Sequence, residues 1–315
     1  MSLETRCLTG RVLSVNISKE KGAPKAPAGI IRVDDLGVAG DAHAGHWHRQ
    51  VSLLAREEVD RFELKAGRPV GNGEFAENIT TAGLDLRQVA LLDRFRIGPV
   101  ELEVTQIGKK CHGAGCAIFN QVGECVMPRE GLFARVIGGG PVQDGDVIEL
   151  VQRPLRIRVI TLSDRASAGE YEDLSGPKIR ELLEAALGAG RWHLDVDCRL
   201  IPDSAPMLEQ LLEDAFQERL DAVFTTGGTG IGPRDITPEV VTRLSDRLLP
   251  GIMDHIRLKY GAANPNALLS RSVAGVTGQT LVFALPGSVK AVSEYMEEIL
   301  KVLEHSLKML HGLGH

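Results

Sequence analysis

The feature that most constrains this chain is a glycine-rich segment, Thr225–Glu239, with the sequence TTGGTGIGPRDITPE. It follows a short apolar run that is typical of a buried strand, and a helical pattern begins at Pro238. The glycines remove the Cβ atoms that would hold a ligand away from the backbone, and they permit positive φ. A strand, a glycine turn and a helix start, in that order, bring backbone N–H groups to a phosphate. The segment therefore predicts an anion-binding turn.

Two charged side chains follow the glycines. Arg234 could bind an anionic oxygen through its forked guanidinium, and Asp235 could hold a divalent cation. The alternative is an ordinary tight turn between a strand and a helix, although such a turn rarely needs four glycines. The P-loop pattern G-x-x-x-x-G-K-[ST] is absent from the sequence, and the glycine spacing is not G-x-G-x-x-G. Both of these nucleotide-binding motifs are thereby excluded.

Composition and length limit the class of protein. The 315 residues are 43% hydrophobic and 25% charged, which is ordinary for globular proteins and suggests two domains. A net charge of −6 argues against nucleic acid as the main partner. We expect no membrane association, because no apolar run reaches spanning length and no signal-peptide pattern begins the sequence. Five cysteines without an export signal favour free thiols and a cytoplasmic location.

Residues 1–152 are predicted to form a β-barrel-like domain, mostly β with attached helices, because short β segments are separated by turns. A turn at Gly98-Pro99 is expected to join two of the strands as a hairpin. The predicted strands are 11–17, 94–97, 100–105 and 147–150, and the predicted helices are 55–65 and 129–137.

Residues 153–315 are predicted to form an α/β domain with a doubly wound, mostly parallel sheet, because strands alternate with helices. The predicted strands are 155–162, 194–201, 222–225 and 280–285, with 271–276 as a hairpin partner of the last, and the predicted helices are 175–189, 204–220, 238–246 and 288–311. Ligands of such sheets bind beyond the carboxyl ends of the strands. Turn and capping chemistry explains any one of the polar loops there, but four loops at one edge favour a pocket.

Two further motifs lie in the first domain. The segment GDAHAGHWHRQ contains His43, His46 and His48 beside Asp41, which could make a metal site, although solvated or core histidines explain it better. The segment GKKCHGAGC places two lysines before Cys111, which would favour the thiolate, the nucleophilic and metal-binding form. A buried structural cysteine is the ordinary alternative, and Cys-x4-Cys lacks the second ligand pair of a typical zinc site.

The second half of the sequence resembles the MogA/MoaB-type molybdopterin adenylyltransferase family. The resemblance covers residues 155–310 and rests on TTGGTG with RDITPE, together with SDRASAGEYEDLSGP, PDS, LPGIMDHIR, LLSRSVAG and ALPGS. It implies that Asp203 and Asp235 are catalytic and hold Mg²⁺, and that the domain forms a trimer. It further implies that molybdopterin and ATP are bound by Ser163, Asp164, Thr226, Gly227, Gly228, Thr229, Gly230, Arg234, Thr237, Ser270, Arg271, Pro286, Gly287 and Ser288.

The first half resembles the MOSC domain, the C-terminal module of molybdenum cofactor sulfurases. The segments GDAHAG, GEFAENITT, LEVTQIGKKC and GDVIEL carry this resemblance. It implies that Cys111 binds or sulfurates molybdenum cofactor or an intermediate. One departure is Leu92 before Asp93, where many members of the family have glycine.

Together the resemblances imply a protein of molybdenum cofactor biosynthesis. The second domain would adenylylate molybdopterin with Mg-ATP and release pyrophosphate, and a molybdate-insertion protein or molybdoenzymes would be its protein partners. Two alternatives stay open. The second domain could be a pterin-binding carrier or scaffold without catalysis, or the main activity could be a molybdenum-dependent reduction centred on the MOSC half.

Overall fold

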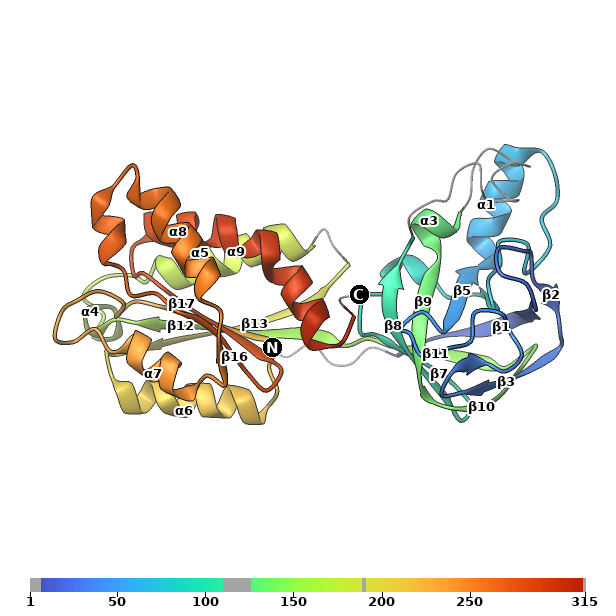
Figure 1. The fold of residues 1–315 in the computed structure, drawn as a ribbon, viewed down its shortest axis with the longest axis horizontal. Coiled ribbons are helices and arrows are strands. Elements are labelled where there is room, and N and C mark those ends of the chain that lie inside the picture. Colours follow the sequence, from blue (N-terminus) through green and yellow to red (C-terminus); the bar gives the residue numbers. More distant parts are fainter. Residues whose placement is uncertain (1–6, 110–125, 189–190, 314–315) are drawn as a thin grey trace. The chain divides into compact units, whose positions relative to one another are not determined.

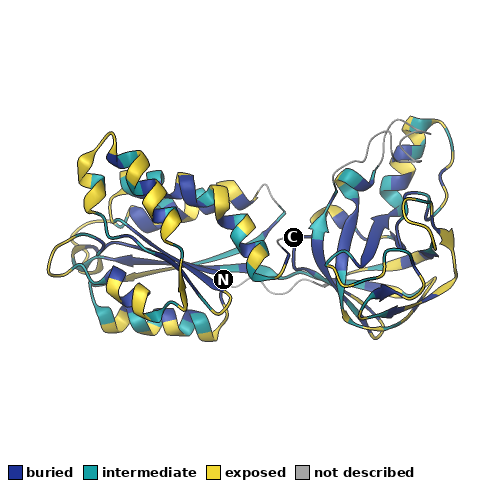
Figure 2. Ribbon diagram, viewed as in Figure 1, coloured by how far each residue is buried: buried dark blue, intermediate teal, exposed yellow. Residues whose placement is uncertain are grey.

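The computed structural model describes residues 7–109, 126–188 and 191–313. The chain divides between Arg153 and Pro154 into two compact units, called unit 1 and unit 2 here. Strands form the buried interior of each unit, as the dark blue ribbons show (Figure 2). Within the described ranges, no helix has both the length and the apolar character needed to cross a bilayer.

Unit 1 is built mainly of strands (Figure 1). Its strands are β1 (Cys7–Ile17), β2 (Ala26–Pro27), β3 (Ile30–Asp34), β4 (Gly37–Val38), β5 (Val51–Ala55), β6 (Ile79–Ala82), β7 (Arg94–Ile97), β8 (Val100–Ile107), β9 (Leu132–Gly138), β10 (Gly140–Gln143) and β11 (Val147–Val151). Its helices are α1 (Arg56–Ala66), the short α3 (Met127–Glu130) and the 3₁₀ turn η1 (Leu86–Gln88).

The strands of unit 1 close into a barrel. They follow the order β11-β7-β8-β9-β5-β6-β1, and β1 pairs again with β11, while β10, β3 and β4 form a small separate sheet. Alternation along β5 shows how the barrel is filled: Val51 and Leu53 point into the main core. Leu54 points the other way and packs against Val59 and Phe62 of α1. The predicted barrel-like fold is confirmed.

One predicted helix of unit 1 is wrong. Residues 129–137 were expected to be helical, but only Met127–Glu130 form a helical turn, and Leu132–Gly138 form strand β9. Strand β9 pairs with both β5 and β8, so its backbone groups are satisfied on two sides. Closure of the barrel therefore outweighs the local helical pattern.

Leu92, which departs from the family pattern, adopts φ of +68°, a conformation that glycine takes more easily.

Unit 2 consists of one sheet with helices on both faces (Figure 1). Its strands are β12 (Pro154–Leu162), β13 (His193–Ile201), β14 (Ala222–Thr226), β15 (Arg247–Leu248), β16 (Ala274–Thr277) and β17 (Thr280–Leu285). Its helices are α4 (Asp164–Ser167), α5 (Ser175–Leu187), α6 (Ala205–Gln217), α7 (Thr237–Leu244), α8 (Pro250–Gly261), the 3₁₀ turn η4 (Pro265–Leu269) and α9 (Val289–Leu310).

The sheet of unit 2 follows the order β13-β12-β14-β17-β16-β15. The first four strands are parallel to one another, and the hairpin of β16 with β17 and the pairing of β15 are antiparallel. Helices α6 and α7 cover one face, and α5, α8 and α9 lie on the other (Figure 1). The doubly wound, mostly parallel sheet predicted from the sequence is confirmed, including its hairpin.

The pattern of apolar residues in α9 shows why this helix could be predicted from the sequence. Buried residues recur in α9 at Val292, Met296, Ile299, Leu303 and Leu307, which places them on one face of a helix. That face packs against β17 of the sheet and against α5. Helix α8, by contrast, was not predicted as a helix.

Truncation of a central aromatic residue should destabilise unit 2. The ring of Phe224 is fully buried and stacks on Phe283 with a centroid distance of 5.1 Å. Phe224→Ala should lower the free energy of unfolding by about 3–5 kcal/mol, because the cavity cannot close around the lost ring. Urea denaturation measures the change. Leu258→Ala, at a side chain that is 72% exposed, is the control and should change it by less than about 0.5 kcal/mol.

Candidate active site

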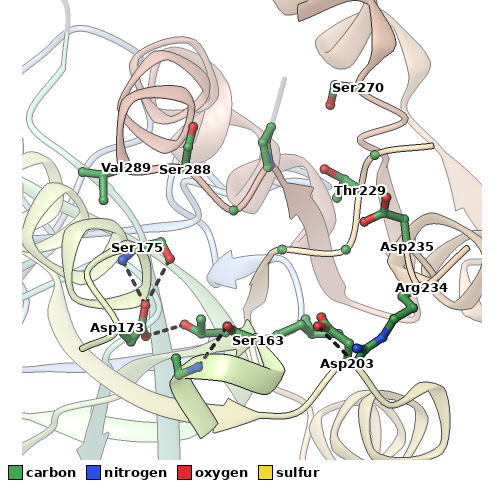
Figure 3. A pocket seen from close by; sticks show the side chains of 18 of the residues that line it. Ser163, Asp173, Ser175, Asp203, Thr229, Arg234, Asp235, Ser270, Ser288 and Val289 are labelled. Atoms are coloured by element: carbon green, nitrogen blue, oxygen red, sulfur yellow. Dashed lines mark hydrogen bonds and ion pairs between the residues drawn. The ribbon is translucent and has the colours of Figure 1, made fainter. Parts of the chain in front are cut away.

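A cavity of about 800 Å³ lies at the carboxyl ends of the parallel strands of unit 2. The loops that follow β12, β13, β14 and β17 all contribute to its lining, and η4 with the next residue adds one more wall. In Figure 3, Asp203, Arg234 and Asp235 lie on one side of the cavity, and Asp173, Ser175 and Val289 lie on the other. Parallel pairing thus brings loops from distant parts of the sequence to one place.

The glycine turn after β14 is shaped by close packing. Gly227 has φ of +104°, and a Cβ there would lie 2.3 Å from the carbonyl oxygen of Leu162. Gly228 has φ of +61°, and its Cβ would lie 2.7 Å from Oγ1 of Thr237. Neither position accepts a side chain without displacing its neighbour.

The other two glycines of the turn make room for a carboxylate. A Cβ on Gly230 or Gly232 would lie 2.8 Å or 3.0 Å from Oδ2 of Asp235. That oxygen accepts a hydrogen bond of 2.7 Å from the backbone N–H of Gly232. The turn is therefore folded around the side chain of Asp235, which it holds against the cavity.

Two carboxylates share the cavity. Asp203, from the loop after β13, lines it together with Asp235. Burial, and then the negative charge of Asp235, raise the pKa of Asp203 above its usual range. Each carboxylate uses Oδ2 for a protein contact, with Asp164 N at 3.3 Å and Gly232 N at 2.7 Å, respectively. In the part of the chain that the structure describes, neither Oδ1 accepts a hydrogen bond, so both are available to a ligand.

Asp164 links the loop after β12 to this acidic pair. Its Oδ1 accepts a hydrogen bond of 2.9 Å from the backbone N–H of Asp203, and its other oxygen forms an ion pair with Arg234. The guanidinium of Arg234 also lies 3.9 Å from Oδ2 of Asp203. Arg234 is 67% exposed at its side chain, so it can move to meet an incoming anion without leaving a buried site.

Most of the predicted binding residues are brought together by the fold. The predicted residues that line the cavity are Ser163, Asp203, Gly227, Gly228, Thr229, Gly230, Arg234, Asp235, Ser270, Pro286, Gly287 and Ser288. Four others, Asp164, Thr226, Thr237 and Arg271, lie outside the lining. Each of these four instead makes hydrogen bonds to a loop that lines it.

Sequence reasoning missed the wall formed by residues 171–175. Asp173 is held there by Oγ1 of Thr161, which donates to it at 2.7 Å, and it accepts from the backbone N–H groups of Ser175 and Gly176 at the start of α5. Tyr171 lies on the same wall, with its hydroxyl 2.8 Å from Oγ of Ser163. The segment belongs to the motif SDRASAGEYEDLSGP, but none of residues 171–175 was predicted to bind a ligand. Asn266, Leu269 and Val289 were missed as well.

The sequence suggested two sites in unit 1, one at Cys111 and one at the histidine segment, and only the second lies within the described residues. Cys111 lies outside the described residues. His43 lies beside Asp41, with its Nδ1 3.3 Å from Oδ1, whereas His46 is exposed and the burial of His48 lowers its pKa. Among the described residues, no group of three histidine, cysteine or acidic side chains is arranged to hold a metal ion.

Comparison with known proteins places these features in a family. A family model described as a probable molybdopterin binding domain matches residues 158–305, and a MOSC domain model matches residues 40–149. Molybdopterin adenylyltransferase of Haemophilus influenzae is 40% identical over 146 residues, which are 46% of this chain and 73% of that protein. The chain belongs to the molybdopterin-binding domain family. Both resemblances drawn from the sequence motifs are confirmed.

Two other known proteins are similar to part of this chain. The molybdopterin adenylyltransferase of Escherichia coli is 38% identical over 160 residues, which are 50% of this chain and 80% of that protein. The crystal structure of the molybdopterin biosynthesis enzyme MoaB from Thermus thermophilus is 41% identical, with a TM-score of 0.46. That match covers 50% of this chain and 97% of the MoaB chain.

The pKa of Asp203 should depend on the charge of Asp235. Asp235→Asn should lower the pKa of Asp203 towards its ordinary value, because the variant removes a negative charge that disfavours ionisation. The pKa should stay somewhat raised, since burial remains. A ¹³C NMR titration of the aspartate carboxyl carbons measures this. Asp214→Asn, on α6 outside the cavity lining, is the control. An unchanged pKa of Asp203 in Asp235→Asn would show that the two groups do not interact.

Proposed function

We propose that unit 2 is a molybdopterin adenylyltransferase that uses Mg-ATP. The observation that carries this proposal is a single cavity that combines two carboxylates with a glycine turn, in a chain whose relatives are named molybdopterin adenylyltransferases. The carboxylates are Asp203 and Asp235, and the turn presents the backbone of residues 227–230. A carrier that only binds a pterin would have no need for two acidic groups beside a phosphate site.

The proposed reaction needs positioning more than covalent help from the protein. An oxygen of the molybdopterin phosphate attacks the α-phosphorus of ATP and forms a new P–O bond. The bond from that phosphorus to the oxygen of the β-phosphate breaks, and pyrophosphate leaves with the electron pair. The protein must hold two polyanions in line and offset their repulsion.

The donor set of the cavity fits Mg²⁺. This ion prefers oxygen ligands, and it is usually held by one or two carboxylates together with phosphate oxygens and water. Asp203 and Asp235 each offer one oxygen that accepts no hydrogen bond from the described residues. Burial, and then repulsion by the charge of Asp235, raise the pKa of Asp203. A divalent cation relieves that repulsion and, when bound, supplies charge stabilisation to the transferring phosphoryl group.

The remaining lining residues have complementary roles in this proposal. The backbone N–H groups of Gly228, Thr229 and Gly230 bind phosphate oxygens, and Arg234 neutralises a further negative charge from the rim. Ser270, on the wall after η4, contacts the pterin. The loop Pro286–Ser288 leads into α9, whose N-terminus favours negative charge at that end of the cavity.

For unit 1 we propose a role in the same pathway. Its MOSC domain would bind or sulfurate molybdenum cofactor, or an intermediate, through Cys111. The fusion of the two domains suggests sequential handling of one pterin intermediate, with a molybdate-insertion protein or molybdoenzymes as partners. From the family resemblance, we further propose that the chain assembles as a trimer through unit 2.

Loss of one carboxylate should separate binding from catalysis. Asp235→Asn should retain molybdopterin but lower the rate of adenylylation by about 10²–10³-fold, because an ion ligand that acts in the transition state is lost. Pyrophosphate release from Mg-ATP and molybdopterin measures the rate, with Asp214→Asn as the control. Full turnover by Asp235→Asn would remove this residue from the mechanism. If the native chain releases no pyrophosphate, the domain is a carrier.

The proposal for unit 1 has an independent test. Cys111→Ala should lower the molybdenum that copurifies with the chain, because the thiolate is the proposed ligand. Elemental analysis of the purified protein measures this content, and Cys198→Ala, at the exposed free cysteine of β13, is the control. Equal molybdenum in the native chain and in Cys111→Ala would eliminate the proposed role.

A further inference from the structure

Two residues outside the cavity lining make several hydrogen bonds to the glycine turn. Thr237 is fully buried at the start of α7, and Arg271 lies just before β16. Oγ1 of Thr237 donates to the carbonyl of Gly227 at 2.9 Å, and its backbone N–H donates to the carbonyl of Gly228 at 3.1 Å. One residue therefore fixes two consecutive carbonyl groups of the turn.

Arg271 continues the series on the next two carbonyl groups. Its backbone N–H donates to the carbonyl of Thr229 at 2.9 Å, and its Nε donates to the carbonyl of Gly230 at 2.6 Å. Nη2 donates to the carbonyl of Asp235 at 2.8 Å, and Nη1 forms an ion pair with Glu239. Residues 227–230 thus have every carbonyl group bound by one of two residues, Thr237 and Arg271.

The direction of the N–H groups follows from the planarity of the peptide bond. In a trans peptide, the C=O of one residue and the N–H of the next point in opposite directions, and the described chain has no cis peptide. Carbonyl groups held on the side of Thr237 and Arg271 therefore turn the N–H groups of residues 228–231 to the other side. Residues 228–231 line the cavity, whereas Thr237 and Arg271 do not. In the described structure, the N–H groups of Gly228, Thr229 and Gly230 donate to no protein acceptor.

We infer that Thr237 and Arg271 are positioning residues that build an anion-binding cradle from the backbone, and that they do not themselves contact substrate. This inference rests on the proposed function in that the ligand of the cradle is a phosphate group. It explains why Gly228 tolerates no side chain, since a Cβ would displace the Thr237 hydroxyl that holds the preceding carbonyl. It also explains the forked side chain at position 271, because Nε and Nη2 of the rigid guanidinium donate to the carbonyl groups of Gly230 and Asp235 in a fixed relative orientation, which the flexible ammonium of lysine does not provide.

The test titrates the full chain with pyrophosphate, without ATP, pterin or magnesium, and follows binding by ³¹P NMR. Thr237→Val should weaken binding by about 3- to 10-fold, since it removes one hydrogen bond that orients the cradle. Thr237→Ser keeps the hydroxyl and should bind like the native chain. Arg271→Lys keeps the positive charge but loses the fork, and should weaken binding by about 10-fold or more.

Matched controls and melting curves exclude a general structural effect. Thr242→Val and Arg243→Lys make the same changes at exposed positions of α7 and should bind pyrophosphate like the native chain. The unliganded melting midpoints of Thr237→Val and Thr237→Ser should agree, while their affinities differ.

Three outcomes would overturn the inference: native affinity in Thr237→Val and Arg271→Lys, equal weakening by Val and Ser at position 237, or no binding of pyrophosphate by the native chain. The titration contains none of the substrates of the adenylylation assay. A chain that binds pyrophosphate as expected but releases none from ATP would contradict the proposed function and leave the cradle intact. Conversely, the native chain could adenylylate normally while Thr237→Val and Arg271→Lys bind pyrophosphate with native affinity. That result would contradict the cradle and leave the proposed function intact.

Discussion

Parallel pairing of β13, β12, β14 and β17 is the constraint on which the candidate active site depends. Each strand of the set ends at the same edge of the sheet, and the register aligns Thr161 with Thr226, and Thr226 with Leu285. Loops that are far apart in the sequence therefore start side by side. An antiparallel arrangement of the same strands would send alternate loops to opposite edges and divide the polar residues between them.

Much of this arrangement could be predicted from the sequence, because the signals involved are local. Alternating apolar runs and helical repeats give the order of elements, and parallel strands then determine which loops meet. The glycine turn could be located because its backbone conformation excludes side chains, as Gly227 and Gly228 show. The acidic residues Asp203 and Asp235 could be assigned through the family motif, and the fold does place both in one cavity.

The features that could not be predicted from the sequence are those that depend on contacts between distant segments. Nothing in the local pattern shows that Arg271 hydrogen-bonds to carbonyl groups some forty positions earlier in the chain, or that Asp173 is bound by Thr161. The strand β9 was missed for the same reason, since its conformation is decided by its two neighbouring strands. Motif membership thus identified important positions, but it did not separate residues that face a ligand from those that support them.

The end of the sheet at β13 has a consequence of a different kind. Within the described residues, β13 pairs with no strand other than β12, so it forms one edge of the sheet. Such an edge invites another strand, and natural sheets oppose this with charged side chains. Asp195, Asp197 and Arg199 alternate along β13, and Asp197 also binds Arg158 at 3.0 Å. Replacing these charges with apolar residues would remove this protection and favour pairing of two such sheets edge to edge.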